Sequence, residues 1–130
     1  MSHLTTLQVE IDDMNAVKET LKELGYEVRE EEQKHTINSR WGWKLNADVS
    51  ATKNDKQMPI GFIQNEETGK IEVQADWFDM DMNQKQFQDE LNRLHAKHKT
   101  INEVKKRGWK VADIKEDNEG NITIDASRWT

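Results

Sequence analysis

The chain has 130 residues, the length of one domain, and we expect residues 1–130 to fold as a single domain. Its 25 acidic residues exceed its 19 basic residues and give a formal net charge of −6, which disfavours non-specific binding of nucleic acid. The chain has no cysteine, and this excludes disulfides, thiolate zinc sites, iron–sulfur clusters and a cysteine nucleophile.

The first third of the chain predicts a strand, a helix and a second strand. Apolar and polar residues alternate over 4–11, which is typical of a half-buried strand. Asp12 then offers an N-cap carboxylate, and apolar residues three or four apart predict a helix that ends at Gly25. Alternation restarts over 26–28, which predicts the second strand. The stretch 29–38 is almost wholly polar, and its charge run over 29–32 cannot contribute to a core, so we expect a loop at the end of this stretch.

The middle of the chain predicts three strands. The cleanest alternation runs from Trp41 to Val49 and predicts the first of them. Polar residues over 52–57 predict a turn after this strand. Residues 60–63 and 71–75 flank a connection that contains glycine, so we expect them to pair as an antiparallel hairpin.

The last third predicts a long helix and another hairpin. Apolar residues recur every three or four positions over 83–107, and Gly108 closes the pattern; Thr100 leaves a break into two helices open. Residues 109–114 and 122–126 bracket a polar turn and predict a hairpin. The order of elements gives an α+β fold, a mostly antiparallel β-sheet with two helices packed on one face.

Short fragments over nearly the whole chain resemble a known family. They are Ser2-His3-Leu4-Thr5-Thr6, Leu24-Gly25-Tyr26, Ala47-Asp48-Val49, Ile60-Gly61-Phe62, Ala75-Asp76-Trp77, and the run from Gly108-Trp109-Lys110-Val111 to Arg128-Trp129. They resemble the uncharacterised domain-of-unknown-function family number twelve fifty-seven, of the hypothetical plastid reading frame thirty-five type, from cyanobacteria, algal plastids and some bacteriophages. This family usually carries a tyrosine-rich stretch where the chain has residues 93–98. The resemblance implies a similar fold and no assigned activity, so no catalytic residues carry over.

A cluster of oxygen-bearing side chains before the long helix has the spacing of a calcium loop. Asp79, Asp81 and Asn83, with Glu90 farther on, occupy ligand positions of such a loop. Gln84 stands where the loop needs a glycine, and the sequence is already helical beyond it. We therefore favour an acidic cluster at the helix N-terminus over a divalent-cation site.

Two histidines on the long helix offer a second candidate for metal binding. His95 and His98 are three residues apart, so they could share one helix face with His3 or a carboxylate completing a site. No HExxH arrangement supports this reading, and His98 lies on the apolar stripe. We favour packing of both rings at the edge of the core, and we expect no cofactor.

Aromatic and cationic residues alternate around one predicted strand. Trp41 and Trp43 stand between Arg40 and Lys44, a pattern typical of stacking platforms for single-stranded nucleic acid. Both indoles share a predicted face with Leu45, so the simpler interpretation places them in the core. Single-stranded nucleic-acid binding is therefore an alternative and not the favoured function.

The favoured function is that of a non-enzymatic protein-binding or adaptor domain with an unidentified protein partner. Trp77 and Phe78 are adjacent, and alternation does not bury both, so we expect them to form an exposed apolar patch. No catalytic motif is present, and we assign no catalytic residue. A small-ligand or metal-dependent enzyme is the remaining alternative. It would need the following groups to converge in one pocket: Asp76, Asp79, Asp81, His95 and His98.

Targeting signals are absent from the sequence. The amino terminus lacks a basic stretch followed by an apolar one, and no segment approaches the roughly 20 apolar residues that span a bilayer. We therefore expect a cytoplasmic protein without membrane contact, in the host cytoplasm if the source is viral and in the stroma if it is plastid-encoded. The oligomeric state stays open.

Overall fold

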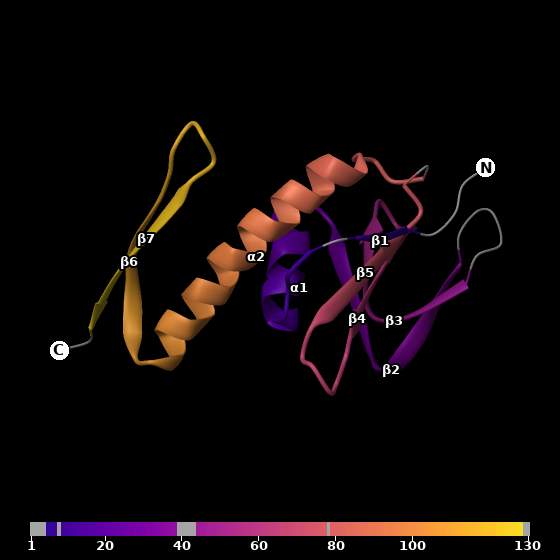
Figure 1. The fold of residues 1–130 in the computed structure, drawn as a ribbon, viewed down its shortest axis with the longest axis horizontal. Coiled ribbons are helices and arrows are strands. Elements are labelled where there is room, and N and C mark those ends of the chain that lie inside the picture. The colour runs from indigo at the N-terminus through magenta and orange to yellow at the C-terminus, as the bar shows by residue number, and fades with distance from the viewer. Residues whose placement is uncertain (1–4, 8, 39–43, 78, 129–130) are drawn as a thin grey trace.

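A computed structural model of the protein describes residues 5–7, 9–38, 44–77 and 79–128 (Figure 1). Its elements are β1 (Thr5–Leu7), α1 (Met14–Glu23), β2 (Glu27–Asn38), β3 (Lys44–Lys53), β4 (Lys56–Gln64), β5 (Ile71–Ala75), α2 (Gln84–Lys106), β6 (Trp109–Glu116) and β7 (Ile122–Arg128). The first five strands form an antiparallel sheet in the order β1-β5-β4-β3-β2, and β6 and β7 form a separate two-stranded sheet. The α+β class is confirmed.

The core lies between the two helices and one face of the five-stranded sheet. Apolar residues of α1 and of the first half of α2 meet the inward residues of the central strands, as the helical spacing predicts. The largest fully buried side chains of this cluster are Ile11, Leu21, Ile60, Phe62, Phe87 and Leu91. Burial of each contributes about 1.5–3 kcal/mol, and this cluster therefore dominates the stability of the body.

The start of the chain differs from the prediction in two details. Of the strand expected over 4–11, residues 5–7 form β1, residues 9–11 belong to no strand, and residues 4 and 8 lie outside the described residues. The carbonyl of Ile11 still accepts a hydrogen bond from the amide of Ile71, the first residue of β5, at 2.9 Å. The N-cap of α1 is Asp13 and not Asp12, since the Oδ1 atom of Asp13 accepts from the Ala16 amide at 3.1 Å. Asp12 instead forms an ion pair with a lysine of α2.

The loop expected at the end of the polar stretch 29–38 is wrong, because these residues continue β2 as an edge strand of the sheet. The backbone of β2 pairs with β3, while most of its side chains are exposed, so a polar sequence satisfies both requirements. The pairing shifts between Glu30 and His35, which marks a bulge. Charges and a bulge on an edge strand disfavour pairing with another sheet.

The connection between β3 and β4 is tighter than the predicted turn over 52–57. Asn54 and Asp55 have φ values of 53° and 63°, and they join Lys53 directly to Lys56. Two consecutive residues with positive φ are typical of a two-residue hairpin turn, which asparagine and aspartate tolerate. The other predicted boundary of β3, at Trp41, lies outside the described residues.

Gly61 in β4 lets a second apolar cluster approach the sheet closely. A Cβ atom at this position would lie 2.6 Å from Cδ2 of Leu45 and 2.9 Å from Cβ of Ala47. The side chain of Ile37 lies against the same point. Since residue 61 has no side chain, Ile37 at the end of β2 and Leu45 and Ala47 in the first half of β3 can pack against β4.

Replacement of Gly61 by alanine is expected to lower the free energy of unfolding by about 1–3 kcal/mol, because the added methyl group overpacks this contact. Urea unfolding of Gly61→Ala beside Glu72→Ala measures the effect. Glu72 is an exposed residue of the neighbouring strand, so its replacement is expected to cost less than about 0.5 kcal/mol. Equal unfolding midpoints for the two variants would contradict the close packing.

The helix α2 is continuous through Thr100, where the sequence left a break open. The Thr100 hydroxyl donates to the carbonyl of Ala96 at 2.9 Å, inside the helix. Gly108, with a φ of 77°, ends the helix as expected. The hairpin of β6 and β7 forms as predicted but stays separate from the main sheet, at the far end of α2 (Figure 1).

Candidate interaction site on the carboxyl-terminal arm

Three of the oxygen-bearing residues with the spacing of a calcium loop, Asp81, Asn83 and Glu90, have separate structural partners. Asn83 caps α2, since its Oδ1 accepts from the amide of Gln86 at 2.8 Å. Glu90 forms an ion pair with Arg93 at 2.6 Å. Asp81 turns to the sheet and not to these groups. Within the described part of the chain, no group of three or more His, Cys, Asp or Glu side chains is placed to hold a metal ion.

Asp81 connects the segment before α2 to the sheet. Its carboxylate accepts hydrogen bonds from the Tyr26 hydroxyl and from Nζ of Lys53, the latter at 2.6 Å. Burial alone would raise the pKa of Asp81, but these two hydrogen bonds outweigh it and lower the pKa. Burial, with Asp81 beside it, raises the pKa of Tyr26. The phenol therefore remains a donor, and the three residues act as a structural clamp.

The two helix histidines point to opposite ends of α1. His95 is buried, and its Nε2 accepts from the backbone amide of Asp13 at 3.1 Å, at the start of α1. His98 lies at the end of α1, with its Nε2 3.4 Å from a carboxylate oxygen of Glu23. Each ring thus joins the two helices at a different place, and the pair does not converge on a shared ligand.

Sequence reasoning missed a buried pair formed by His35 and Ser50. The Nε2 of His35 lies 2.7 Å from the Ser50 hydroxyl, across the β2–β3 pairing. Ser50 is fully buried, so a substrate cannot reach its hydroxyl. The pair is therefore structural and not a nucleophile with its base. The register pairs His35 with Ala47 and Ser50 with Arg29, so the two residues meet at the bulge between Glu30 and His35, and the sequence held no signal for it.

Stability is expected to fall on mild acidification because of His35 and His95. Burial lowers the pKa of each below the ordinary 6.5, so the unfolded chain binds protons that the folded chain does not. The free energy of unfolding therefore decreases as the pH falls through about 6.5 toward the lowered pKa values. Urea unfolding at about pH 7.5 and about pH 5.5 measures this decrease.

A variant with His35→Asn and His95→Gln controls this measurement. Neither amide titrates, so the variant is expected to lose less stability between the two pH values than the wild type, whatever its stability at neutral pH. The carboxylates with lowered pKa values, such as Asp48, protonate only below the ordinary 3.8 and do not contribute in this range. If the wild type and the variant lose the same free energy of unfolding between the two pH values, the assignment of the pH dependence to His35 and His95 is wrong.

Trp77 lies at the rim of the core and not in an open patch. Its ring is half-buried and packs on Phe87, with 5.6 Å between ring centroids and a tilt of 56°. Its Nε1 is buried and has no hydrogen-bond partner among the described residues. The rest of the expected binding residues, namely Phe78, Arg40, Trp41 and Trp43, lie outside the described residues. Lys44 is exposed at the start of β3.

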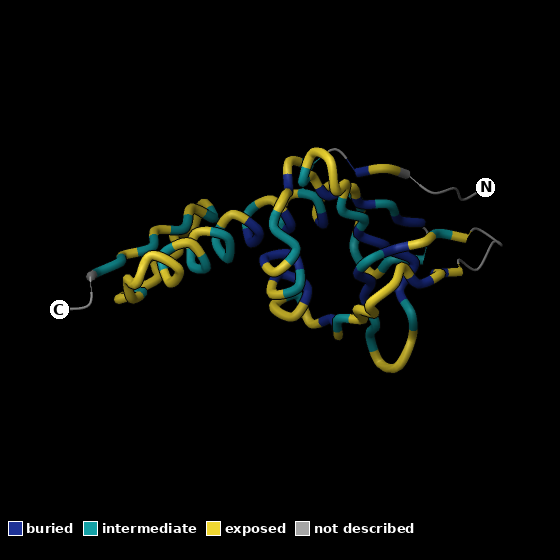
Figure 2. The backbone as a smooth tube through the Cα atoms, turned by 90° about the horizontal axis from the view of Figure 1, so that it is seen from below, coloured by how far each residue is buried: buried dark blue, intermediate teal, exposed yellow. Residues whose placement is uncertain are grey.

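The least buried part of the described chain is its carboxyl-terminal arm, which we define as residues 100–128. The arm consists of the last two turns of α2 with β6 and β7, and it extends away from the body of the protein (Figure 2). Every residue from 100 to 127 is exposed or intermediate, and none is buried. The exposed large hydrophobic side chains of the described chain, Trp109 and Ile114, both belong to the arm.

The hairpin of the arm has one apolar face. The strand register places Val111 opposite Ala126 and Ile114 opposite Ile124, so these side chains share a face. This face turns toward α2, where a hollow of about 380 Å³ is lined by Thr100, Val104, Trp109 and Ala126 among others. The helix covers only part of it, since Trp109 remains 36% exposed and Ile114 40% exposed.

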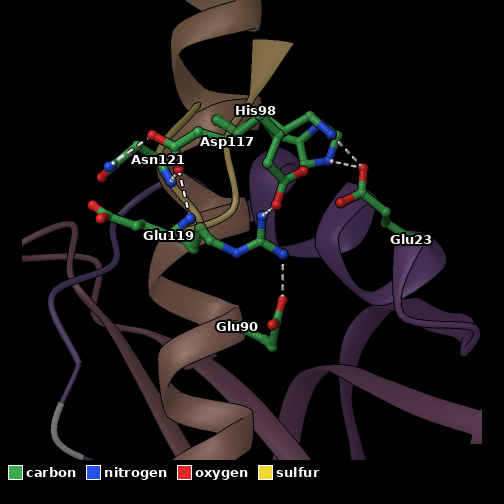
Figure 3. Close-up of polar contacts among 9 residues, drawn as sticks. Glu23, Glu90, His98, Asp117, Glu119 and Asn121 are labelled. Atoms are coloured by element: carbon green, nitrogen blue, oxygen red, sulfur yellow. Dashed lines mark hydrogen bonds and ion pairs between the residues drawn. The ribbon is translucent and has the colours of Figure 1, made fainter. Parts of the chain in front are cut away.

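Polar contacts tether the tip of the hairpin to the middle of α2 (Figure 3). Arg93 forms ion pairs with Glu90 of its own helix and with Glu116 of β6. Glu90 is the main cause that raises the pKa of Arg93. In the turn, the carboxylate of Asp117 accepts from the amides of Glu119 and Asn121, each at 2.9 Å. The hairpin is thus held in place at both ends, by the chain at Gly108 and by Arg93.

A second set of contacts in Figure 3 joins α2 to the end of α1. Glu23 accepts a hydrogen bond from Nζ of Lys97 at 2.7 Å and lies beside His98. Burial alone would raise the pKa of Glu23, but Lys97 outweighs it and lowers the pKa. These contacts attach α2 to the body just before the arm begins, so the arm extends from a fixed point.

Comparisons with known proteins place the chain in a family. The profile of the family described as "Protein of unknown function (DUF1257)" matches residues 20–124. The chain is 25% identical over 129 residues to the "Uncharacterized protein ycf35" of Pyropia yezoensis, covering 99% of this chain and 98% of that protein. It is 23% identical over 129 residues to the protein of the same description from Cyanophora paradoxa, with the same coverage. No solved structure gives a significant match. The protein therefore belongs to the DUF1257 family, as the resemblance of its sequence fragments implied.

Proposed function

We propose that this protein is a protein-binding domain and that the arm is its binding element. The observation that carries the proposal is the half-covered apolar face of the hairpin, on which Trp109 lines the hollow against α2 and both Trp109 and Ile114 are exposed. A two-stranded hairpin is marginally stable in water unless its apolar face is packed. A partner polypeptide that lies along this face, with apolar side chains in the hollow, would complete the packing and bury the aromatic anchor.

The alternatives have less support. Of the groups in the enzyme alternative, Asp81, His95 and His98 contact different partners, and each has a structural role. The nucleic-acid alternative depends on Arg40, Trp41 and Trp43, and the net charge of −6 opposes it. No helix within the described residues is long and apolar enough to cross a bilayer. We expect binding to take place in the cytoplasm, or in the stroma of a plastid.

Affinity capture with matched variants tests the proposal. The variant Ile114→Lys puts a charge on the apolar face of the hairpin, whereas Lys115→Ala changes its exposed neighbour on the other face. We expect wild type and Lys115→Ala to retain the same partner in stoichiometric amounts and Ile114→Lys to lose it. Circular dichroism verifies that all three are folded. Retention of that partner by Ile114→Lys would contradict the proposal.

A further inference from the structure

A broad groove lies at the base of the arm, between α1, the second half of α2 and the start of β2. Its volume is about 1100 Å³, which exceeds the roughly 300–1,000 Å³ of typical small-molecule sites. Val28 and Ile101 contribute apolar surface to it. Its charged and titratable lining is formed mainly by cationic side chains, together with one histidine and two glutamates: Lys18, Lys22, Lys105, Lys106, His98, Glu19 and Glu30.

Both glutamates of the groove already have cationic partners. Nζ of Lys18 lies 2.8 Å from Glu30, and Nζ of Lys22 lies 3.3 Å from Glu19. Two of the four lysines therefore remain as uncompensated charge. These are Lys105 and Lys106, which form no ion pair within the described part of the chain. The groove is thus locally positive in a protein whose net charge is negative.

The positive charge extends along the second half of α2. Residues 93–107 contain six basic side chains, Arg93, Lys97, Lys99, Lys105, Lys106 and Arg107, against the single acidic Glu103. The first three are neutralised by acidic partners on α1, the preceding loop, the hairpin or α2 itself. Lysines in the last turn of a helix stabilise it by interacting with the helix dipole, which is another explanation for Lys105 and Lys106. That explanation does not account for the lysines of α1 that line the same groove.

We propose that this groove binds an acidic polypeptide segment that carries apolar residues among its carboxylates. The lysines on its rim match the carboxylates, and Val28 and Ile101 match the apolar side chains. The open space between the two helices and the start of β2 suits a peptide better than an enclosed small ligand. This inference rests on the proposed function, protein binding, and adds the chemistry of the partner at a surface other than the hairpin face.

Fluorescence anisotropy with a labelled peptide of repeated Glu-Glu-Leu tests the inference on the full chain. The unlabelled competitors are a Gln-Gln-Leu peptide and single-stranded DNA of matched charge. The test variant is Lys105→Glu with Lys106→Glu. The control is Lys56→Glu with Lys85→Glu, which changes the net charge equally at exposed positions on β4 and in the first turn of α2.

We expect the acidic peptide to bind the wild type and the control alike, and to bind the Lys105/Lys106 variant at least about tenfold more weakly, with binding reduced by salt. Equal binding by all three proteins, or none, would overturn the inference. Preferential competition by DNA would assign the groove to nucleic acid, and lysine-dependent self-association in sedimentation would assign it to a second copy; either outcome overturns it. Ile114 does not line the groove, so the Ile114→Lys variant is expected to bind the acidic peptide like the wild type. Failure of the groove proposal can therefore be distinguished from failure of the hairpin proposal.

Discussion

Truncation of Phe87 to alanine is expected to lower the free energy of unfolding by about 3–5 kcal/mol. Phe87 is fully buried in α2, and its ring packs against Trp77 and the inward face of the sheet. Its removal leaves a cavity where the helix, the sheet and the segment before α2 meet. Urea unfolding, followed by tryptophan fluorescence and circular dichroism, measures the loss.

Two further variants keep this prediction decisive. Lys85→Ala changes an exposed residue two positions earlier and is expected to alter stability by less than about 0.5 kcal/mol. Phe87→Leu retains most of the apolar volume and is expected to lower the free energy of unfolding by less than Phe87→Ala does. It can therefore be measured even if the alanine variant does not fold. A loss below about 1 kcal/mol for Phe87→Ala would show that the ring is not enclosed.

The replacement Ile114→Lys is expected to weaken partner binding by about 30-fold or more, since central apolar anchors contribute about 2 kcal/mol or more to an interface. Its effect on stability is expected to be small, no more than about 1 kcal/mol, because Ile114 is already 40% exposed. Isothermal titration of the captured partner against wild type, Ile114→Lys and Lys115→Ala measures the difference in affinity.

The combination of results distinguishes binding from folding. If Phe87→Ala destabilises the protein and Ile114→Lys does not, the body and the arm have separate tasks. Weak binding by Ile114→Lys together with large destabilisation would instead indicate that the hairpin is part of the folding core. Unchanged affinity in Ile114→Lys, with a folded protein, would remove the hairpin face as the binding surface.

The elements with strong local patterns could be predicted from the sequence. The apolar stripe of α1 and the glycines at its end and at the end of α2 define both helices, because helix ends and faces depend on neighbouring residues. The start of β2 was predicted, but the loop expected at the end of the stretch 29–38 was wrong for a physical reason. An edge strand exposes most of its side chains, so it needs no alternating apolar residues, and its backbone pairing leaves no trace in the sequence.

The candidate site was less predictable because its features depend on distant residues. The pairing of β6 with β7 is local and was expected, but whether the hairpin joins the main sheet depends on tertiary packing. Trp77 was expected in an exposed patch, yet Phe87 lies near enough in space to cover it. The sequence over 93–107 contains six basic residues and one acidic residue, so the positive charge of this half of α2 could have been predicted. It was missed because the net charge of the whole chain is negative.

Hydrogen exchange of the complex with the captured partner tests the central claim most directly. No residue over 100–127 is buried, so the amides of β6, β7 and the end of α2 are expected to exchange faster than those of β4 and β5 in the free protein. If the arm is the binding element, partner binding will slow exchange over residues 100–128 and leave the central strands unchanged. Protection confined to the five-stranded sheet, with no change in the arm, would contradict the account.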